Sequence, residues 1–182
     1  MQKLALLQSG WDDMVPTQLV REWEEFFNKL SLLSKVRINR VAFSSEWAEI
    51  QFHCFADASE LAYGACLYVR ATDTAGNICI ELLSSKSRVA PLKRITLPRL
   101  ELCVADIAAH LYSKVIKSLK MNNTLAFFWS DSTIVLHWLK APPNTWQTFI
   151  ANRVSRIQTL TYGHGWQHIA GKGNPRIWCL VE

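Results

Sequence analysis

The stretch QFHCFADASELAYGACLYV, residues 51–69, contains a strand pattern that ends on an acidic residue. Phe52, Cys54 and Ala56 alternate with residues of the other face, which is the two-residue period of a half-buried strand. Asp57 follows directly, at a place where burial penalises a carboxylate unless a cation compensates its charge. The pattern raises the question of which cation this is, and the rest of the chain suggests a divalent metal.

The order of elements around this strand predicts an α/β fold. Three strands in an antiparallel meander are followed by a helix, a strand, two helices and a last strand. Such an order builds a mixed sheet, because a crossover helix introduces parallel pairing after the meander. A polar, basic loop is expected between the third strand and the first long helix. The predicted strands are 49–57, 63–70, 78–84, 125–129 and 166–169. Three helices are predicted after the meander: a long one that begins at Pro98, a short one over 134–139, and one over 146–160.

The first 47 residues differ from the rest of the chain. Apolar residues recur there at helical spacing after Pro16, which predicts one amphipathic helix that packs against a neighbour. We expect a connection segment over residues 1–47 and a second domain over residues 48–182. The residues of the apolar stripe are Leu19, Trp23, Phe26, Phe27, Leu30 and Leu33.

Composition narrows the class of protein. Hydrophobic residues make up 49% of the 182-residue chain, which is enough for a core, and the net charge of +5 permits a polyanionic partner. No apolar run reaches the ~20 residues that cross a bilayer, so no membrane partner is expected. The five cysteines show no zinc-binding spacing and indicate reduced thiols in an intracellular protein, cytoplasmic or nuclear.

Three acids occupy comparable places in the predicted fold. Asp57 ends the first strand, Asp131 ends the fourth, and Glu101 lies in the first turn of the long helix. If they converge at one edge of the sheet, they repel one another unless hard cations such as Mg²⁺ neutralise them. Each acid also has a simpler interpretation: Asp57 as a turn residue, Glu101 as an acid at a helix N-terminus, and Asp131 as a helix cap. Taken together, the three positions favour the metal site.

Basic residues gather before and within the start of the long helix, and one more lies in the last glycine-rich loop. A solvated basic loop and a phosphate-contacting strip are equally consistent with this pattern. The candidate nucleic-acid-binding residues are Lys86, Arg88, Lys93, Arg94, Arg99 and Lys172.

Five segments together resemble the RNase H-like region of BEL/Pao-type LTR retrotransposon polyproteins, which is also catalogued as a Pao retrotransposon peptidase family. The preceding residues 11–38 look like the connection that follows the reverse transcriptase. The segments are FADAS (55–59), SKSRVAPLKRITLPRLEL (85–102), WSDSTIVLHWL (129–139), FIANRVSRI (149–157) and WQHIAGKGNP (166–175).

This resemblance implies an RNase H-like fold with a mixed five-stranded sheet, and metal-dependent endonucleolytic cleavage of the RNA strand in RNA–DNA hybrids. It implies that Asp57, Glu101 and Asp131 are both catalytic and metal-binding, with Mg²⁺ or Mn²⁺ as cofactor. The implied partners are a hybrid or another nucleic acid, and the reverse transcriptase domain of the same polyprotein.

The chain departs from the family near its end. The family has a fourth carboxylate where the last loop enters a final helix, whereas this chain reads Asn174-Pro175-Arg176. A cation in that place would repel a divalent ion. From about residue 176 we therefore expect a truncated or altered end without the final helix, and activity that is weakened or lost.

Two other functions stay open. A non-catalytic remnant could bind nucleic acid or act as a scaffold, as Arg176 suggests. An aspartic peptidase would need an Asp-Thr/Ser-Gly turn, whereas Asp57 is followed by Ala58, Ser59 and Glu60.

Overall fold

The computed structural model describes residues 4, 7, 10, 12–37, 47–121, 123–171 and 174. The chain forms two compact units, Met1–Ile38 and Asn39–Glu182. The boundary predicted after residue 47 stays a prediction. Arg176, the altered end and the absence of a final helix lie outside the described residues, as do Lys172 and Cys179. The cysteines within the described part, Cys54, Cys66, Cys79 and Cys103, are free thiols.

The first unit contains the predicted amphipathic helix. Helix α2 spans Thr17–Lys29 and continues as a 3-10 helix, η1, over Leu30–Lys35. Within residues 17–35 no side chain is buried, and Trp23, Phe27 and Leu33 are each more than half exposed. The apolar stripe is therefore formed as predicted, and its own unit does not cover it.

The second unit is built on a five-stranded mixed sheet in the order β3-β2-β1-β4-β5. The first three strands pair antiparallel, and β4 and β5 add parallel pairs, which confirms the predicted α/β class. The strands are β1 (Trp47–Ala58), β2 (Ala62–Asp73), β3 (Ile78–Val89), β4 (Leu125–Ser130) and β5 (Gly165–His168).

Strand β3 is longer than its apolar part predicts. It runs to Val89 because its polar second half pairs with β2, from Ser84 opposite Leu67 to Val89 opposite Ala62. The sequence assigned Lys86 and Arg88 to a loop, and this assignment is wrong: both lie in an edge strand with exposed side chains.

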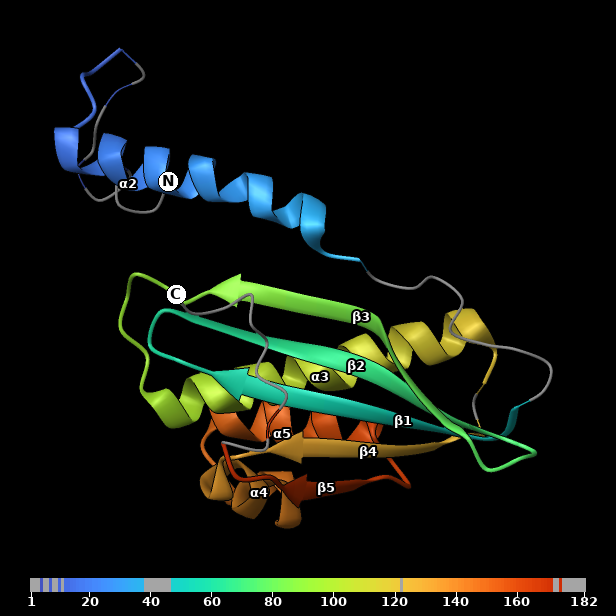
Figure 1. Ribbon diagram of the computed structural model, residues 1–182. Coiled ribbons are helices and arrows are strands. Elements are labelled where there is room, and N and C mark those ends of the chain that lie inside the picture. The colour runs from blue at the N-terminus through green and yellow to red at the C-terminus, as the bar shows by residue number, and fades with distance from the viewer. Residues whose placement is uncertain are drawn as a thin grey trace. The chain divides into compact units, whose positions relative to one another are not determined.

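Helices α3 and α5 lie on one face of this sheet (Figure 1). Phe52, Cys54 and Ala56 of β1 point into a core that includes Val104 and Ala108 of α3. A second core joins α3 to α4 and α5 through residues such as Leu102, Val135 and Val154. Long helix α3 is thereby held on two sides. The helices are α3 (Leu97–Leu119), α4 (Thr133–Lys140) and α5 (Thr148–Leu160), with a short 3-10 turn, η2 (Pro143–Thr145), between the last two.

The alternate residues of β1 and β4 form an aromatic layer on the other face. Phe55 lies opposite Trp129 in the parallel register, and their rings stack with centroids 6.1 Å apart. The indole N–H of Trp129 donates to Nδ1 of His53 at 3.2 Å, and the two rings are nearly parallel. The alternation that identified β1 in the sequence therefore sorts its side chains between two packed layers.

Candidate active site

Two of the predicted acids lie at the same edge of the sheet. In the parallel pairing of β1 with β4, Ala56 is opposite Ser130, so Asp57 and Asp131 each follow a paired position on adjacent strands. Adjacent strands are only about 4.8 Å apart, which brings the two residues near one another. Asp57 itself pairs with Gly64 of β2 and belongs to the strand. The interpretation of Asp57 as a turn residue is therefore wrong.

The turn after β1 is organised by Ser59. Its hydroxyl accepts hydrogen bonds from the backbone N–H groups of Leu61 and Ala62, at 3.3 and 3.2 Å. The reversal of the chain thus begins after Ala58, where β1 ends.

Glu101 reaches this edge from α3. The helix Leu97–Leu119 has no acidic residue in its first turn, so the prediction that Glu101 lies there is wrong by a small margin. The difference matters because an acid beyond the first turn gains little from the partial positive charge of the helix N-terminus. The Ser132 hydroxyl donates a hydrogen bond to Oε2 of Glu101 at 2.6 Å.

The pKa of Glu101 reports what surrounds its carboxylate. Burial raises this pKa above its ordinary value, the hydrogen bond from Ser132 opposes the rise, and the negative charges of Asp131 and Asp57 add to it. The side chain is half-buried. The charges of Asp131 and Asp57 therefore both reach the Glu101 carboxylate.

Ser132 is a site residue that the sequence reasoning missed. It caps α4, because its hydroxyl accepts the backbone N–H of Val135 at 3.2 Å. The alternative in which Asp131 is the cap is therefore wrong. The available signal was a serine three residues before an apolar helical position, which is a common N-cap pattern. One hydroxyl thus fixes both the start of α4 and the carboxylate of Glu101.

The loop after β5 lies across the same edge. Ile169 N–H donates to Ser130 O at 3.1 Å, and a Cβ added at Gly171 would lie 3.7 Å from Oδ2 of Asp131. The Asn174 side-chain amide donates to Ala56 O at 3.5 Å. Among the described residues, the buried Oδ1 of Asn174 finds no hydrogen-bond partner. This loop therefore adds a free amide oxygen close to the strand end that carries Asp57.

The donor chemistry of this edge fits a hard divalent cation, because Mg²⁺ prefers carboxylate and amide oxygens. The described part of the chain, which includes all three acids, nevertheless contains no group of three or more His, Cys, Asp or Glu residues placed to hold a metal ion. The charges of Asp131 and Asp57 act on Glu101 at this edge, but the three acids do not form a closed ligand set. The metal site stays a prediction.

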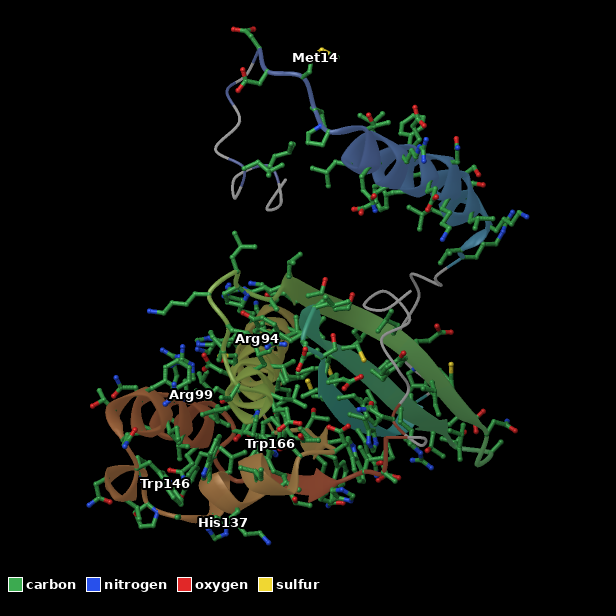
Figure 2. The ribbon with its side chains drawn as sticks, turned by 90° about the vertical axis from the view of Figure 1, so that its left-hand side faces the viewer. Met14, Arg94, Arg99, His137, Trp146 and Trp166 are labelled. Atoms are coloured by element: carbon green, nitrogen blue, oxygen red, sulfur yellow. The ribbon has the colours of Figure 1, made fainter. Side chains whose placement is uncertain are left out.

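The predicted basic strip is divided between two places. Lys93, Arg94 and Arg99 are exposed around the start of α3, where Arg94 forms a surface ion pair with Glu60 at 3.4 Å. Figure 2 shows Arg94 and Arg99 at this end of the second unit. Lys86 and Arg88 project instead from β3.

A family profile, described as Pao retrotransposon-like RNaseH-like domain, matches residues 1–132. The chain belongs to this family. The match contains Asp57, Glu101 and Asp131 and ends at Ser132, so α4, α5 and β5 lie beyond it. This confirms the resemblance stated from the sequence motifs, and the chain is an RNase H-like domain of a retroelement.

Solved structures with a similar arrangement share little sequence. RNase H1 from the halophilic archaeon Halobacterium salinarum NRC-1 is 14% identical, with a TM-score of 0.42 over 73% of this chain and 94% of that one. LC11-RNase H1 in complex with an RNA/DNA hybrid is 15% identical, with a TM-score of 0.46 over 70% of this chain and 90% of that one. A foamy viral protease-reverse transcriptase with an RNA/DNA hybrid is 10% identical, with a TM-score of 0.40 over 74% of this chain and 18% of that one.

The search of curated proteins found no match to this chain. Across the described residues, none of the helices has the length and apolar character needed to cross a membrane.

Proposed function

We propose that this domain is a divalent-metal-dependent endonuclease that cuts the RNA strand of RNA–DNA hybrids. The observation that carries the proposal is the half-buried Glu101, which shares one sheet edge with Asp57 and Asp131: burial raises its pKa, and the charges of Asp131 and Asp57 raise it further. Such clustered charge is costly without a cation, and converging carboxylates that bind metal are a common device for phosphodiester cleavage.

Each acid has a distinct place in the proposed site. Asp57 and Asp131 would hold Mg²⁺ or Mn²⁺ from the ends of β1 and β4, and Glu101 would complete the ligands from α3. A cation held by these residues would supply Lewis-acid stabilisation of the phosphate and would favour ionisation of an attacking water. Ser132 would keep the Glu101 carboxylate oriented, since its hydroxyl already donates to Oε2.

The basic residues would contact the backbone of the hybrid. Lys93 and Arg94 are exposed just before α3, which favours phosphate contacts there. Arg99 is also exposed, but its guanidinium lies over the Phe149 ring of α5, on the side of α3 away from Glu101, so it would contact the hybrid at some distance from the three acids. Lys86 and Arg88 add positive charge along β3, and Lys172 would contribute from the loop between Gly171 and Asn174. The reverse transcriptase domain of the same polyprotein would present the hybrid, in an intracellular compartment.

The end of the chain sets the expected level of activity. Arg176 lies outside the described residues, so its effect rests on the sequence alone: a cation replaces a family carboxylate and weakens or abolishes cleavage. Changing Arg176→Asp should then raise the cleavage rate of the full chain, with Arg176→Gln as the charge-neutral control. If neither change alters the rate, Arg176 does not limit activity.

One observation favours a second candidate function, a non-catalytic unit that binds nucleic acid. The three acids, all within the described residues, are not placed to hold a metal ion as a group. In this alternative the basic surface still binds a hybrid, and the carboxylate edge is a remnant. Among the described residues, Asp57 lies within strand β1 and not in the turn that an aspartic peptidase would need, which speaks against that function.

One experiment separates the two candidates. A labelled RNA–DNA hybrid is incubated with the full chain over a range of Mg²⁺ or Mn²⁺ concentrations, while cleavage and fluorescence anisotropy are both recorded. Metal-dependent cleavage that disappears in Asp57→Asn and Asp131→Asn supports the nuclease. Binding without cleavage at any metal concentration, with no divalent binding by calorimetry, supports the non-catalytic unit.

A further inference from the structure

A cavity of about 380 Å³ lies on the other side of α3. Its walls come from strands β2 and β3 and from helices α3 and α5, so segments far apart in the sequence meet there. Most of its polar lining is cationic. The charged side chains are Lys86 and Arg88 of β3, Asp106 and Lys114 of α3, and Arg153 and Arg156 of α5.

The only carboxylate among these lining residues is already engaged. Asp106 accepts two hydrogen bonds from Arg156, from Nε at 2.8 Å and from Nη2 at 2.6 Å. His110 approaches Asp106 at 3.7 Å from the next turn of α3. In the described part of the chain, Lys86, Arg88, Lys114 and Arg153 form no ion pair. The cavity therefore has a surplus of positive charge that the lining itself does not neutralise.

Arg153 is held in place by its neighbours on α5 and carries N–H groups that can donate hydrogen bonds to an anion. Its guanidinium lies 3.7 Å from the centroid of the Phe149 ring, and Nη1 donates to Phe149 O at 3.0 Å. Its Nε is buried, and no hydrogen-bond partner for it exists among the described residues. A stacked guanidinium loses little freedom when it binds a ligand, because stacking has already fixed its plane.

The cavity is distinct from the candidate active site. With about 3.6 residues per helical turn, Cys103, Asp106 and His110 lie on the side of α3 roughly opposite Glu101. Glu101 instead bonds to Ser132 at the start of α4. A ligand in the cavity would therefore not touch the three acids.

We propose that this cavity binds a phosphate group of a nucleic-acid strand, at a second place away from the point of cleavage. Phosphate matches the planar donors of arginine and the point charges of lysine. The volume lies within the range of small-ligand sites, so it can admit a nucleotide unit and not only an ion. The proposal rests on the nucleic-acid binding proposed above and is independent of whether the domain cleaves.

The test measures binding of a labelled RNA–DNA hybrid to the full chain, by anisotropy in EDTA so that no cleavage occurs. The variant Lys86→Gln/Arg88→Gln removes two exposed cations of the cavity, and Arg153→Gln removes the stacked one. Each should weaken binding about tenfold at low salt and lower the slope of log Kd against log salt by about one for each phosphate that is no longer neutralised. The control Lys117→Gln/Lys120→Gln removes two exposed charges at the end of α3, outside the cavity, and should leave both quantities unchanged.

Two outcomes would count against the proposal, and two further measurements serve as controls. Cavity variants that bind the hybrid as the control does would overturn it. Thermal stabilisation by inorganic phosphate that both cavity variants lose, with hybrid binding unchanged, would assign the cavity to a small phosphate ligand instead of a strand. Equal melting temperatures of the Lys86→Gln/Arg88→Gln variant and the wild type show that weaker binding is not due to unfolding. Absent cleavage by both the wild type and the Arg176→Asp variant would refute the nuclease while leaving this binding test intact.

Discussion

Helix α3 carries opposite charge on two of its sides. On one side Glu101 lies within reach of two further carboxylates and bonds to a serine hydroxyl. On the other side Asp106 is outnumbered by the lysines and arginines of β3, α3 and α5. A bound cation would compensate the negative charge of the first side, and a bound anion would compensate the positive charge of the second. A polyanionic substrate bound together with divalent metal would satisfy both.

The two sides of α3 are also formed in different ways. The side with Glu101, called the acidic side below, is formed by strand pairing, since β1 and β4 end at the same sheet edge and α3 packs across them. The side with Asp106 and the surrounding lysines and arginines, called the basic side below, depends on the packing of α5 against α3. This packing allows Arg156 to donate a hydrogen bond to Asp106, 50 positions earlier in the chain. Strand pairing produces a local pattern that can be found in a sequence, whereas the approach of two helices does not.

The largest expected effect comes from the acidic side. Asp57→Asn, Asp131→Asn and Glu101→Gln should each lower the rate of hybrid cleavage by about 100-fold or more, because each removes a charge that a reactive cation needs. Asp106→Asn, on the other side of the same helix, should retain the rate. Initial rates at saturating hybrid measure this. Equal losses in all four variants would mean that the two sides are not functionally different.

Sequence reasoning found the acidic side because its signals are local. The alternation before Asp57 and the apolar strand before Asp131 locate two strand ends, and the mixed sheet brings them together. It missed the length of β3, because the segment from Ser85 to Arg88 is polar and lacks the apolar alternation that marks a strand, although it pairs with β2. It also missed Ser132, whose second role depends on where Glu101 projects.

The cavity could not be predicted in the same way. Arg153 and Arg156 read as ordinary surface positions of an amphipathic helix, and their meaning depends on the packing of α5 against α3. Lys86 and Arg88 were recognised as binding candidates, although in a loop. The sequence therefore supplied the charges and not the cavity that they line.

A change that loosens α3 should damage both sides together. Leu102 is fully buried between α3, α4 and α5, and Leu102→Ala should lower the free energy of unfolding by about 2–5 kcal/mol. Leu119→Ala, at the partly exposed end of the same helix, should cost less than about 1 kcal/mol. Denaturant unfolding measures the difference. A small loss at Leu102 would contradict the view that α3 is fixed by this second core.

Ser132 offers a smaller change confined to the acidic side. Ser132→Ala removes the cap of α4 and should lower stability by about 0.5–2 kcal/mol. It should also raise the pKa of Glu101 further, because the hydrogen bond that lowers this pKa is removed. Thermal unfolding and NMR titration of the Glu101 carboxylate measure the two effects. Thr133→Ala, one residue on and exposed, is the control and should leave the pKa of Glu101 unchanged.

The smallest expected effect concerns Asp73, whose pKa is lowered, in contrast to the raised pKa of Glu101. Hydrogen bonds from the Asn77 side chain and backbone, and from Ala75, lower the pKa of Asp73 in the turn between β2 and β3. A lowered folded pKa stabilises the protein above the unfolded value of about 4, and this stability is lost as pH falls through the folded pKa. Asp73→Asn should therefore lower the melting temperature at neutral pH, and the gap should narrow in acid.

The matched variant Asn77→Ala tests the cause of that shift. It removes the side-chain donor that contributes most to the lowered pKa of Asp73, while the backbone donors can remain. NMR titration should then find the pKa of Asp73 moved up, toward the ordinary aspartate value. Because Asp73 lies in a surface turn and is only partly buried, water and salt screen its interactions, and the change in melting temperature should be the smallest of the series. A gap for Asp73→Asn that stays constant down to low pH would show that the turn depends on the shape of the side chain and not on its charge.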